Sequence, residues 1–212
     1  MNRSYLVTAG PTREFIDDVR YLSNLSSGRM GYAIARAASR AGHRVVLVSG
    51  PTALPPPEGV EVAGVVSAAE MRDAVLQSAP GCGIIVMAAA VADYRPAARI
   101  SGKMKKGPDA LELRLVRTPD ILAELGAAKA GRFLVGFALE ADNALANARA
   151  KMAAKNCDMM VLNSPAAMAA ERSEIHLLRP GGGVLTLGPA PKDDLAVELV
   201  RIIDEAASRQ ES

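Results

Sequence analysis

Short apolar segments alternate with alanine-rich segments along most of this 212-residue chain. The apolar segments are rich in β-branched residues or leucine, and several lack the polar alternation of a half-exposed strand. We expect strands near residues 5–9, 44–49, 60–66, 84–88, 133–137 and 159–162, and helices near residues 28–41, 68–77, 119–125, 142–155 and 192–208. This order predicts an α/β fold with a mostly parallel sheet, whose strands are joined by right-handed crossover helices.

Two segments depart from this alternation. Residues 93–118 are basic, contain proline and have no helical period, so we interpret them as a mobile flap. Residues 174–188 contain two apolar runs separated by Pro180–Gly183, which predicts a hairpin at the edge of the sheet. The chain has no internal repeat, low-complexity segment or linker, and we therefore expect residues 1–212 to form one domain.

The composition argues against several classes of function. Lys and Arg number 25 against 23 Asp and Glu, and aromatic residues make up only 3% of the chain, so nothing indicates nucleic-acid binding. The first residues do not resemble a secretory leader, and no apolar stretch is long enough to span a bilayer, which predicts a cytoplasmic protein without a membrane partner.

The cysteines and histidines are few. Cys82 and Cys157 lie in apolar runs without a CxxC spacing, so we expect buried free thiols rather than a disulfide, a metal site or a nucleophile. With His43 and His176 as the two histidines of the chain, a histidine-based metal site is also disfavoured.

Folds of this kind bind ligands beyond the carboxyl ends of the strands. The first strand is followed there by a long irregular segment, residues 10–28, instead of the tight GxGxxG turn of a dinucleotide-binding fold. Ser26, Ser27 and Gly28 then precede a helix. They either cap this helix or, together with its free amide groups, hold a phosphate, and the residues alone favour neither interpretation.

Two later segments offer groups for a ligand. Residues 88–90 are alanines, small enough for a ligand to approach the backbone, and Asp93 is suited to bind sugar hydroxyls or a base amine, although a turn aspartate explains it slightly better. Lys103, Lys105 and Lys106 form either a solvated charge run or part of a flap that closes over a polyphosphate. Their glycine-flanked setting and the neighbouring candidate residues favour the second interpretation.

Three other segments have ordinary structural explanations. Residues 118–120 suit a helix start, with Thr118 as its cap and Asp120 at the positive end of the helix dipole. Phe137 either stacks on a base or packs in the core. Lys151 and Lys155 share one helix face, and a solvated face is the default interpretation for them.

The order and spacing of the motifs resemble one family. TAGPTRE, VRYLSNLSSGRMG, LVSGP, AAAVADYRP, KMKK, TPDI, VGFALE and AKNCD follow one another as in the phosphopantothenoylcysteine synthetases, the ligases of coenzyme A biosynthesis, and the chain looks most like the bacterial type. The resemblance covers nearly the whole chain. It implies a three-layer α/β/α fold, Rossmann-like and ribokinase-like, that works as a homodimer.

The resemblance also implies a two-step reaction. The carboxylate of 4'-phosphopantothenate attacks the α-phosphate of CTP, with Mg²⁺ on the triphosphate, to give an acyl-cytidylate and pyrophosphate. The amine of L-cysteine then displaces CMP. Related enzymes use ATP, which is the alternative co-substrate. Many bacterial relatives contain a flavin-dependent decarboxylase, so such a domain or protein is an expected partner.

Two functions of other classes compete with this one. A nicotinamide-dependent reductase is opposed by the missing GxGxxG and by Ser49–Gly50, where an acidic residue would end the second strand. A non-catalytic nucleotide-binding module would bind nucleotide without releasing pyrophosphate, and it would be indifferent to Asn24→Asp.

Matching the family's motifs residue by residue gives a predicted site. The resemblance implies that Asn24 hydrogen-bonds the reacting carboxylate or acyl oxygen, that Asp93 recognises the cytidine, and that Lys103 lies near the phosphates. Asn24 and Lys103 are thus the predicted catalytic residues, and the metal ligands stay unassigned. The predicted nucleotide-binding residues are Met87, Ala88, Ala89, Asp93, Lys103, Pro119, Asp120, Ile121, Leu122, Phe137, Lys151 and Lys155. The predicted substrate-binding residues are Asn24, Ser26, Ser27, Gly28, Ala89 and Ala90.

Overall fold

An eight-stranded sheet forms the centre of the protein in this computed structural model, which describes residues 3–107, 110–140, 142–164 and 172–210. The strand order is β12-β11-β10-β9-β6-β1-β4-β5. The parallel strands are β1 (Ser4–Ala9), β4 (Arg44–Ser49), β5 (Glu61–Gly64), β6 (Ile84–Met87), β9 (Phe133–Leu139) and β10 (Met159–Asn163). β11 (Arg172–Leu178) and β12 (Val184–Pro191) continue the sheet in antiparallel fashion.

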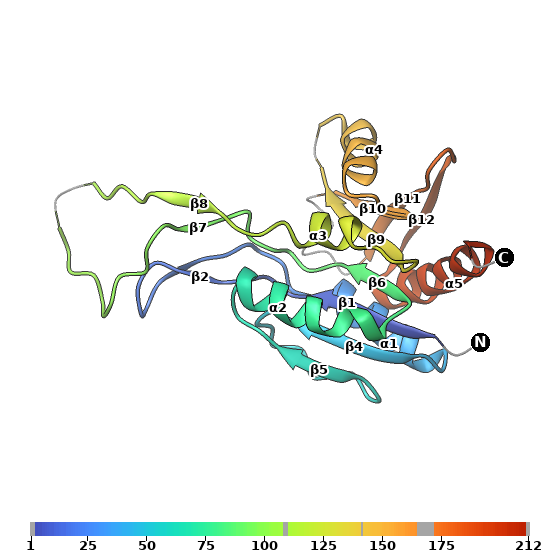
Figure 1. Cartoon of the computed structure of the whole chain (residues 1–212), viewed down its shortest axis with the longest axis horizontal. Helices are drawn as coiled ribbons and strands as arrows, with labels where there is room; N and C mark the ends of the chain where they lie inside the picture. The colour runs from blue at the N-terminus through green and yellow to red at the C-terminus, as the bar shows by residue number, and fades with distance from the viewer. Residues whose placement is uncertain (1–2, 108–109, 141, 165–171, 211–212) are drawn as a thin grey trace.

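Helices cover both faces of this sheet, as the nearly continuous apolar strands predict (Figure 1). The helices are α1 (Arg29–Arg40), α2 (Ala68–Ser78), α3 (Ile121–Ala127), α4 (Ala144–Ala154) and α5 (Lys192–Gln210), with a short 3₁₀ turn at Ala79–Gly81. One face packs against α1 and α5 and the other against α2, α3 and α4, so that Tyr5 and Leu6 of β1 point into different cores. The predicted three-layer α/β/α fold is confirmed.

The strand order reverses between β1 and β6. From β1 the chain moves to β4 and then to the edge strand β5, and it returns past β1 to form β6, β9 and β10. Loops that follow β1 and β6 therefore leave the sheet in opposite directions and open a crevice at its carboxyl edge. An isolated bridge pairs Pro11 with Ala90 just beyond these two strands.

The start of α3 differs from the sequence-based expectation. The cap is Asp120, whose carboxylate accepts a hydrogen bond from the Ala123 amide at 3.0 Å, and not Thr118. The Thr118 hydroxyl instead donates to the carbonyl oxygen of Ala92 at 2.5 Å. Both residue types can cap a helix, so the tertiary contact of Thr118 decides between them.

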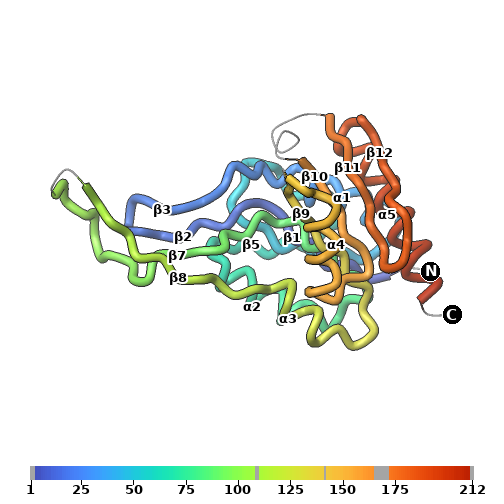
Figure 2. The backbone as a smooth tube through the Cα atoms, turned by 90° about the horizontal axis from the view of Figure 1, so that it is seen from above, coloured from blue at the N-terminus to red at the C-terminus, as the bar shows by residue number. Residues whose placement is uncertain are grey.

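The predicted flap is a long ribbon that extends away from the sheet (Figures 1 and 2). Its two ends pair as β7 (Tyr94–Pro96) and β8 (Leu115–Arg117), and its residues 108 and 109 lie outside the described residues. The flap runs beside a small hairpin of β2 (Glu14–Phe15) and β3 (Tyr21–Leu22), which the sequence did not predict. We call residues 14–22 the N-terminal hairpin.

The remaining expectations concern the C-terminal ribbon, the thiols and the membrane. The hairpin predicted at residues 174–188 is confirmed and is longer, since β11 and β12 span residues 172–191. Cys82 and Cys157 are buried free thiols, as predicted. Within the described ranges, no helix is both long and apolar enough to cross a membrane, and no group of three His, Cys, Asp or Glu residues is placed to hold a metal.

Candidate active site

Two adjoining cavities open at the carboxyl edge of the sheet. The smaller one has a volume of about 440 Å³ and lies between the ends of β6 and β9 and the starts of α3 and the flap. The larger one has a volume of about 660 Å³ and lies between the loop before α1 and the loop after β6. They share a wall, which consists of Ala89, Val91, Asp93, Phe137 and Lys151.

The smaller cavity gathers most of the predicted nucleotide-binding residues. Ten of the twelve line it, although they come from four separate segments of the chain: Met87, Ala89, Asp93, Pro119, Asp120, Ile121, Leu122, Phe137, Lys151 and Lys155. Ala88 lines the larger cavity instead. A residue with a structural role can also line the cavity: Asp120 both caps α3 and belongs to the lining.

Two lysines of α4 are held in place at the smaller cavity. Lys155 forms an ion pair with Asp120, and Lys151 donates a hydrogen bond to the carbonyl oxygen of Phe137 at 3.0 Å. Burial opposes ionisation of Asp120, but the bonds from Lys155 and the Ala123 amide, with the charge of Lys151, hold the pKa of this carboxyl below its usual value. The cavity lining therefore contains two fixed ammonium groups and an ionised carboxylate that is paired with one of them.

The larger cavity gathers all the predicted substrate-binding residues. These are Asn24, Ser26, Ser27, Gly28, Ala89 and Ala90. The N-cap of α1 is Gly28, which has no side chain to cap the helix, so neither serine is the N-cap residue; the Ser26 hydroxyl accepts from the Gly28 amide at 3.4 Å. Gly28 has a φ of 76° and a Cβ on it would lie 2.8 Å from Cγ2 of Thr52, so glycine is required at this turn. The start of α1 thus lines the cavity with no side chain on its N-cap residue, which suits an anion.

Asn24 connects the two loops that form the larger cavity. Its Nδ2 donates to the carbonyl oxygen of Ala90 at 2.6 Å, and its Oδ1 accepts from the Ser26 amide at 3.1 Å. The Thr12 hydroxyl supports the same junction by accepting from the Ala92 amide at 3.0 Å. Because an amide group has two N–H donors, the Asn24 side chain still has one donor for a ligand beside the Ala90 contact.

Two cations at the larger cavity were not predicted. Arg29 is the first residue of α1 and Lys192 is the first residue of α5, and both line the cavity. Lys192 is only 8% exposed, and burial together with the charge of Arg29 lowers its pKa. A cation in the first turn of a helix opposes the helix dipole. That unfavourable placement, repeated in two helices, was the sequence signal that could have drawn attention to them.

Lys103 is the predicted site residue that lies apart. It belongs to neither lining, and it is exposed on the flap between Gly102 and Met104, which contact the N-terminal hairpin. The structure therefore brings together the predicted residues of the sheet edge, α1, α3 and α4, but not the flap lysine.

Known proteins share this fold and sequence. Residues 1–206 match the family model described as "DNA/pantothenate metabolism flavoprotein C-terminal domain". The chain belongs to this family. Among curated members of related sequence, the Coenzyme A biosynthesis bifunctional protein CoaBC of Bacillus subtilis is 43% identical over 210 residues, which cover 97% of this chain and 52% of that protein. CoaBC of Vibrio vulnificus is 48% identical over 165 residues, covering 76% of this chain and 41% of that protein.

Solved structures agree with the fold. The crystal structure of the C-terminal domain of a CoaBC protein superposes with a TM-score of 0.85 at 39% identity, covering 98% of this chain and 96% of that domain. A Cab2 variant in complex with phosphopantothenate-cysteine superposes with a TM-score of 0.84 at 16% identity, which shows a shared fold. The chain thus matches the C-terminal domain of CoaBC and spans about half the length of the curated relatives.

Proposed function

We propose that this chain is a phosphopantothenate–cysteine ligase, which joins 4'-phosphopantothenate to L-cysteine with CTP. The observation that supports it most is the convergence of distant motifs. Residues 24–28, 87–91, 93, 119–122, 137, 151 and 155 surround two cavities that share one wall. One cavity suits a nucleotide and the other an acyl chain that ends in a carboxylate, and the shared wall is where the two would meet.

In the first step the carboxylate of 4'-phosphopantothenate attacks the α-phosphate of CTP and pyrophosphate leaves. Two anions must approach each other, so the protein has to supply positive charge and hydrogen-bond donors. The second N–H of Asn24, the start of α1 and the cations Arg29 and Lys192 offer these at the larger cavity. In the second step the amine of L-cysteine attacks the acyl carbonyl carbon and CMP leaves.

Mg²⁺ fits the groups that line the larger cavity. Asp93 and Glu140 are the acidic residues of its lining, and Mg²⁺ on a triphosphate is usually held by one or two carboxylates together with phosphate oxygens. When bound, the ion would supply positive charge to the triphosphate. In our proposal Glu140 is available for the ion, and Asp93, which also lines the smaller cavity, binds the cytidine.

We also propose that the chain works as a cytoplasmic homodimer, with a flavin-dependent decarboxylase as a domain or partner. The flap and the N-terminal hairpin support the homodimer, since they expose large apolar side chains, among them Val19, Tyr21, Tyr94 and Leu115. Exposed apolar groups of this size are typical of an interface with another protein surface. The molar mass in solution, measured by light scattering, tests this part of the proposal.

The activity is tested by pyrophosphate release from the purified chain with Mg²⁺ and 4'-phosphopantothenate. CTP is compared with ATP, each with and without L-cysteine. Pyrophosphate release with CTP, followed by cysteine-dependent formation of CMP, is the expected result. Release with ATP alone would keep the ligase and overturn the choice of nucleotide. Nucleotide binding without any release would refute the ligase and leave a binding module.

A further inference from the structure

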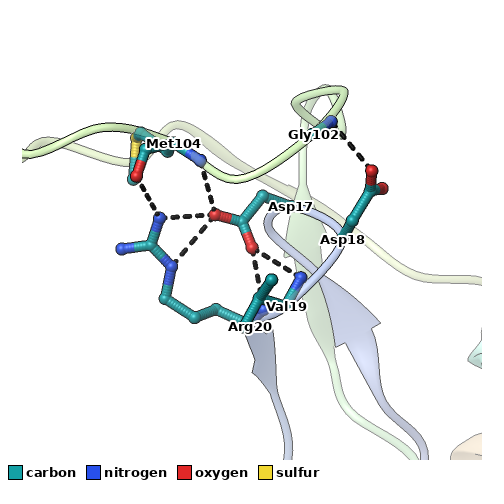
Figure 3. A network of polar contacts seen from close by, with 6 residues as sticks. All are labelled: Asp17, Asp18, Val19, Arg20, Gly102 and Met104. Carbon is teal, nitrogen blue, oxygen red and sulfur yellow. Dashed lines mark hydrogen bonds and ion pairs between the residues drawn. The ribbon is translucent and has the colours of Figure 1, made fainter.

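The N-terminal hairpin grips the flap on both sides of Lys103 (Figure 3). On one side, the Met104 amide donates to Oδ2 of Asp17 at 3.1 Å, and the Met104 carbonyl oxygen accepts from Nη2 of Arg20 at 3.1 Å. On the other side, the Gly102 amide donates to Oδ2 of Asp18 at 2.8 Å, and the Gly102 carbonyl oxygen accepts from the Asp18 amide at 3.3 Å. All four backbone polar groups that flank Lys103 are therefore bound to the hairpin.

Asp17 organises this contact. Its side chain is fully buried, and Oδ1 accepts from the amides of Val19 at 2.9 Å and Arg20 at 2.8 Å. Its Oδ2 accepts from Nε of Arg20 at 3.0 Å as well as from Met104, and Nη2 of Arg20 completes the ion pair. A carboxylate has enough lone pairs for all these donors, whereas an asparagine has a single acceptor oxygen. The Arg20 bond is the main reason that the pKa of Asp17 lies below its usual value, so the group is ionised at neutral pH.

Asp18 adds a second, more exposed attachment. Its Oδ1 accepts from Nη2 of Arg99 at 2.8 Å, and the Arg99 guanidinium lies 4.7 Å from the ring centroid of Phe15 in β2. The Ile100 amide donates to the Ile16 carbonyl oxygen at 2.9 Å. Residues 99–104 of the flap and residues 15–20 of the hairpin are thus tied along their length and would move as one body.

We propose that Asp17 and Asp18 are positioning residues for Lys103, which fix the direction in which the flap presents its ammonium group. This inference rests on the proposed function and on the family resemblance, which implies that Lys103 lies near the phosphates although it belongs to neither cavity lining here. The hairpin continues directly into the loop of Asn24, so the two predicted catalytic residues are connected through the hairpin. Without these contacts to the hairpin, Lys103 would still lie on the flap, but the backbone on both sides of it would no longer be held in place. A shift of about 1 Å in a catalytic group can lower a rate about 100-fold.

The test is a double-mutant cycle on the ligase reaction. Asp17→Asn, Asp18→Asn and Lys103→Gln are made singly, and each aspartate variant is combined with Lys103→Gln. We expect Asp17→Asn to lower kcat on the order of 100-fold, and Asp18→Asn to lower it less, while KM for CTP stays within about threefold. In the Lys103→Gln background, each aspartate change should lower kcat no further than about twofold. Equal losses in both backgrounds would overturn the proposal.

Asp73→Asn is the matched control, because Asp73 forms an exposed ion pair with Arg72 on α2, away from the flap. It should leave kcat unchanged. Asp18→Asn still tests the proposal if Asp17→Asn fails to fold, since the Asp18 side chain is half exposed whereas that of Asp17 is buried.

Amide hydrogen exchange measures the grip without the reaction. The Met104 amide should exchange at least tenfold faster in Asp17→Asn than in the wild type, and the Gly102 amide should do so in Asp18→Asn. Exchange of both at the wild-type rate would overturn the proposal. If the wild type makes no product, the proposed function fails, and this exchange measurement still decides whether the hairpin holds the flap. If Lys103→Gln is fully active, the link between the grip and catalysis is refuted.

Discussion

Replacing Asn24 by aspartate is the most informative single change at the larger cavity. In the wild type Nδ2 donates to the Ala90 carbonyl oxygen at 2.6 Å. The substitution places a carboxylate oxygen against that carbonyl oxygen, and it also removes the second donor that is available to the substrate. The junction between the loop before α1 and the loop after β6 would therefore lose the Asn24 bond but keep the two bonds of Thr12 to Ala90 and Ala92, and the cavity would gain a negative charge.

Two effects of different size should follow. The Ala90 carbonyl oxygen is only partly buried and also accepts from the Thr12 amide at 3.3 Å, so losing the Asn24 bond costs about 0.5–1.5 kcal/mol. At about 2–4 °C per kcal/mol for a chain of this length, the Tm should fall by about 1–6 °C. Turnover should fall more strongly. Losing one preorganised donor at developing negative charge costs about 2.7–4 kcal/mol, which is a loss of about 100- to 1,000-fold in kcat.

Asn156→Asp separates these two effects. Nδ2 of Asn156 donates to the Gly126 carbonyl oxygen at 3.0 Å, which is the same kind of bond, and Asn156 belongs to neither cavity lining. This control should lower the Tm modestly and leave kcat near the wild-type value. Turnover is measured as pyrophosphate release at saturating substrates, and Tm by calorimetry. An Asn24→Asp variant with kcat within about fivefold of Asn156→Asp would refute the assignment of Asn24.

Three further predictions concern Tyr5, Asp120 and Cys157. The Tyr5 hydroxyl donates to Oδ1 of Asp204 at 2.7 Å, so Tyr5→Phe should lower the free energy of unfolding by about 1.5–3 kcal/mol, measured by chemical denaturation. Burial and then Asp204 raise the pKa of this phenol, so the loss of stability should be equal at pH 6 and about pH 9. A loss that vanishes at pH 9 would contradict this prediction. Asp120→Asn should weaken CTP binding while lowering the Tm by less than about 4 °C, because asparagine also caps helices and the ion pair with Lys155 is partly exposed; unchanged CTP affinity would remove Asp120 from the site. Burial raises the pKa of the Cys157 thiol to about 11, so its rate of labelling at pH 8 should be at least about 100-fold below that of a free thiol. This rate should rise about tenfold per pH unit. Fast labelling of the folded protein would show that the thiol is accessible.

The sheet and its helices could be predicted because their signals are local. The apolar runs at β1, β4 and β6 are bounded by polar or glycine residues, and α1 and α5 have clear helical period. The strands β2 and β3 contain two residues each, too short for any periodic pattern, and they were missed. The start of α3 was misplaced because Thr118 and Asp120 are both good caps, and only the tertiary contact of Thr118 distinguishes them.

The site could be predicted to the extent that it follows from topology. Parallel strands place the segments after β1, β6 and β9 at one edge, so the convergence of Asn24, Asp93 and Phe137 follows from the strand order once the family's motifs point to them. Lys192 was missed because it reaches the cavity only through the packing of α5 on α1, which links distant parts of the chain. The position of Lys103 depends on the grip of the N-terminal hairpin, for which the sequence has no pattern.

The shared wall has a consequence for inhibition. Ala89, Val91, Asp93, Phe137 and Lys151 border both cavities, so a single small molecule seated on them would intrude into both. Such a compound should be competitive against CTP and against 4'-phosphopantothenate at the same time. Extending it into either cavity adds contacts without a second loss of translational freedom, so affinity should rise steeply with each correct extension.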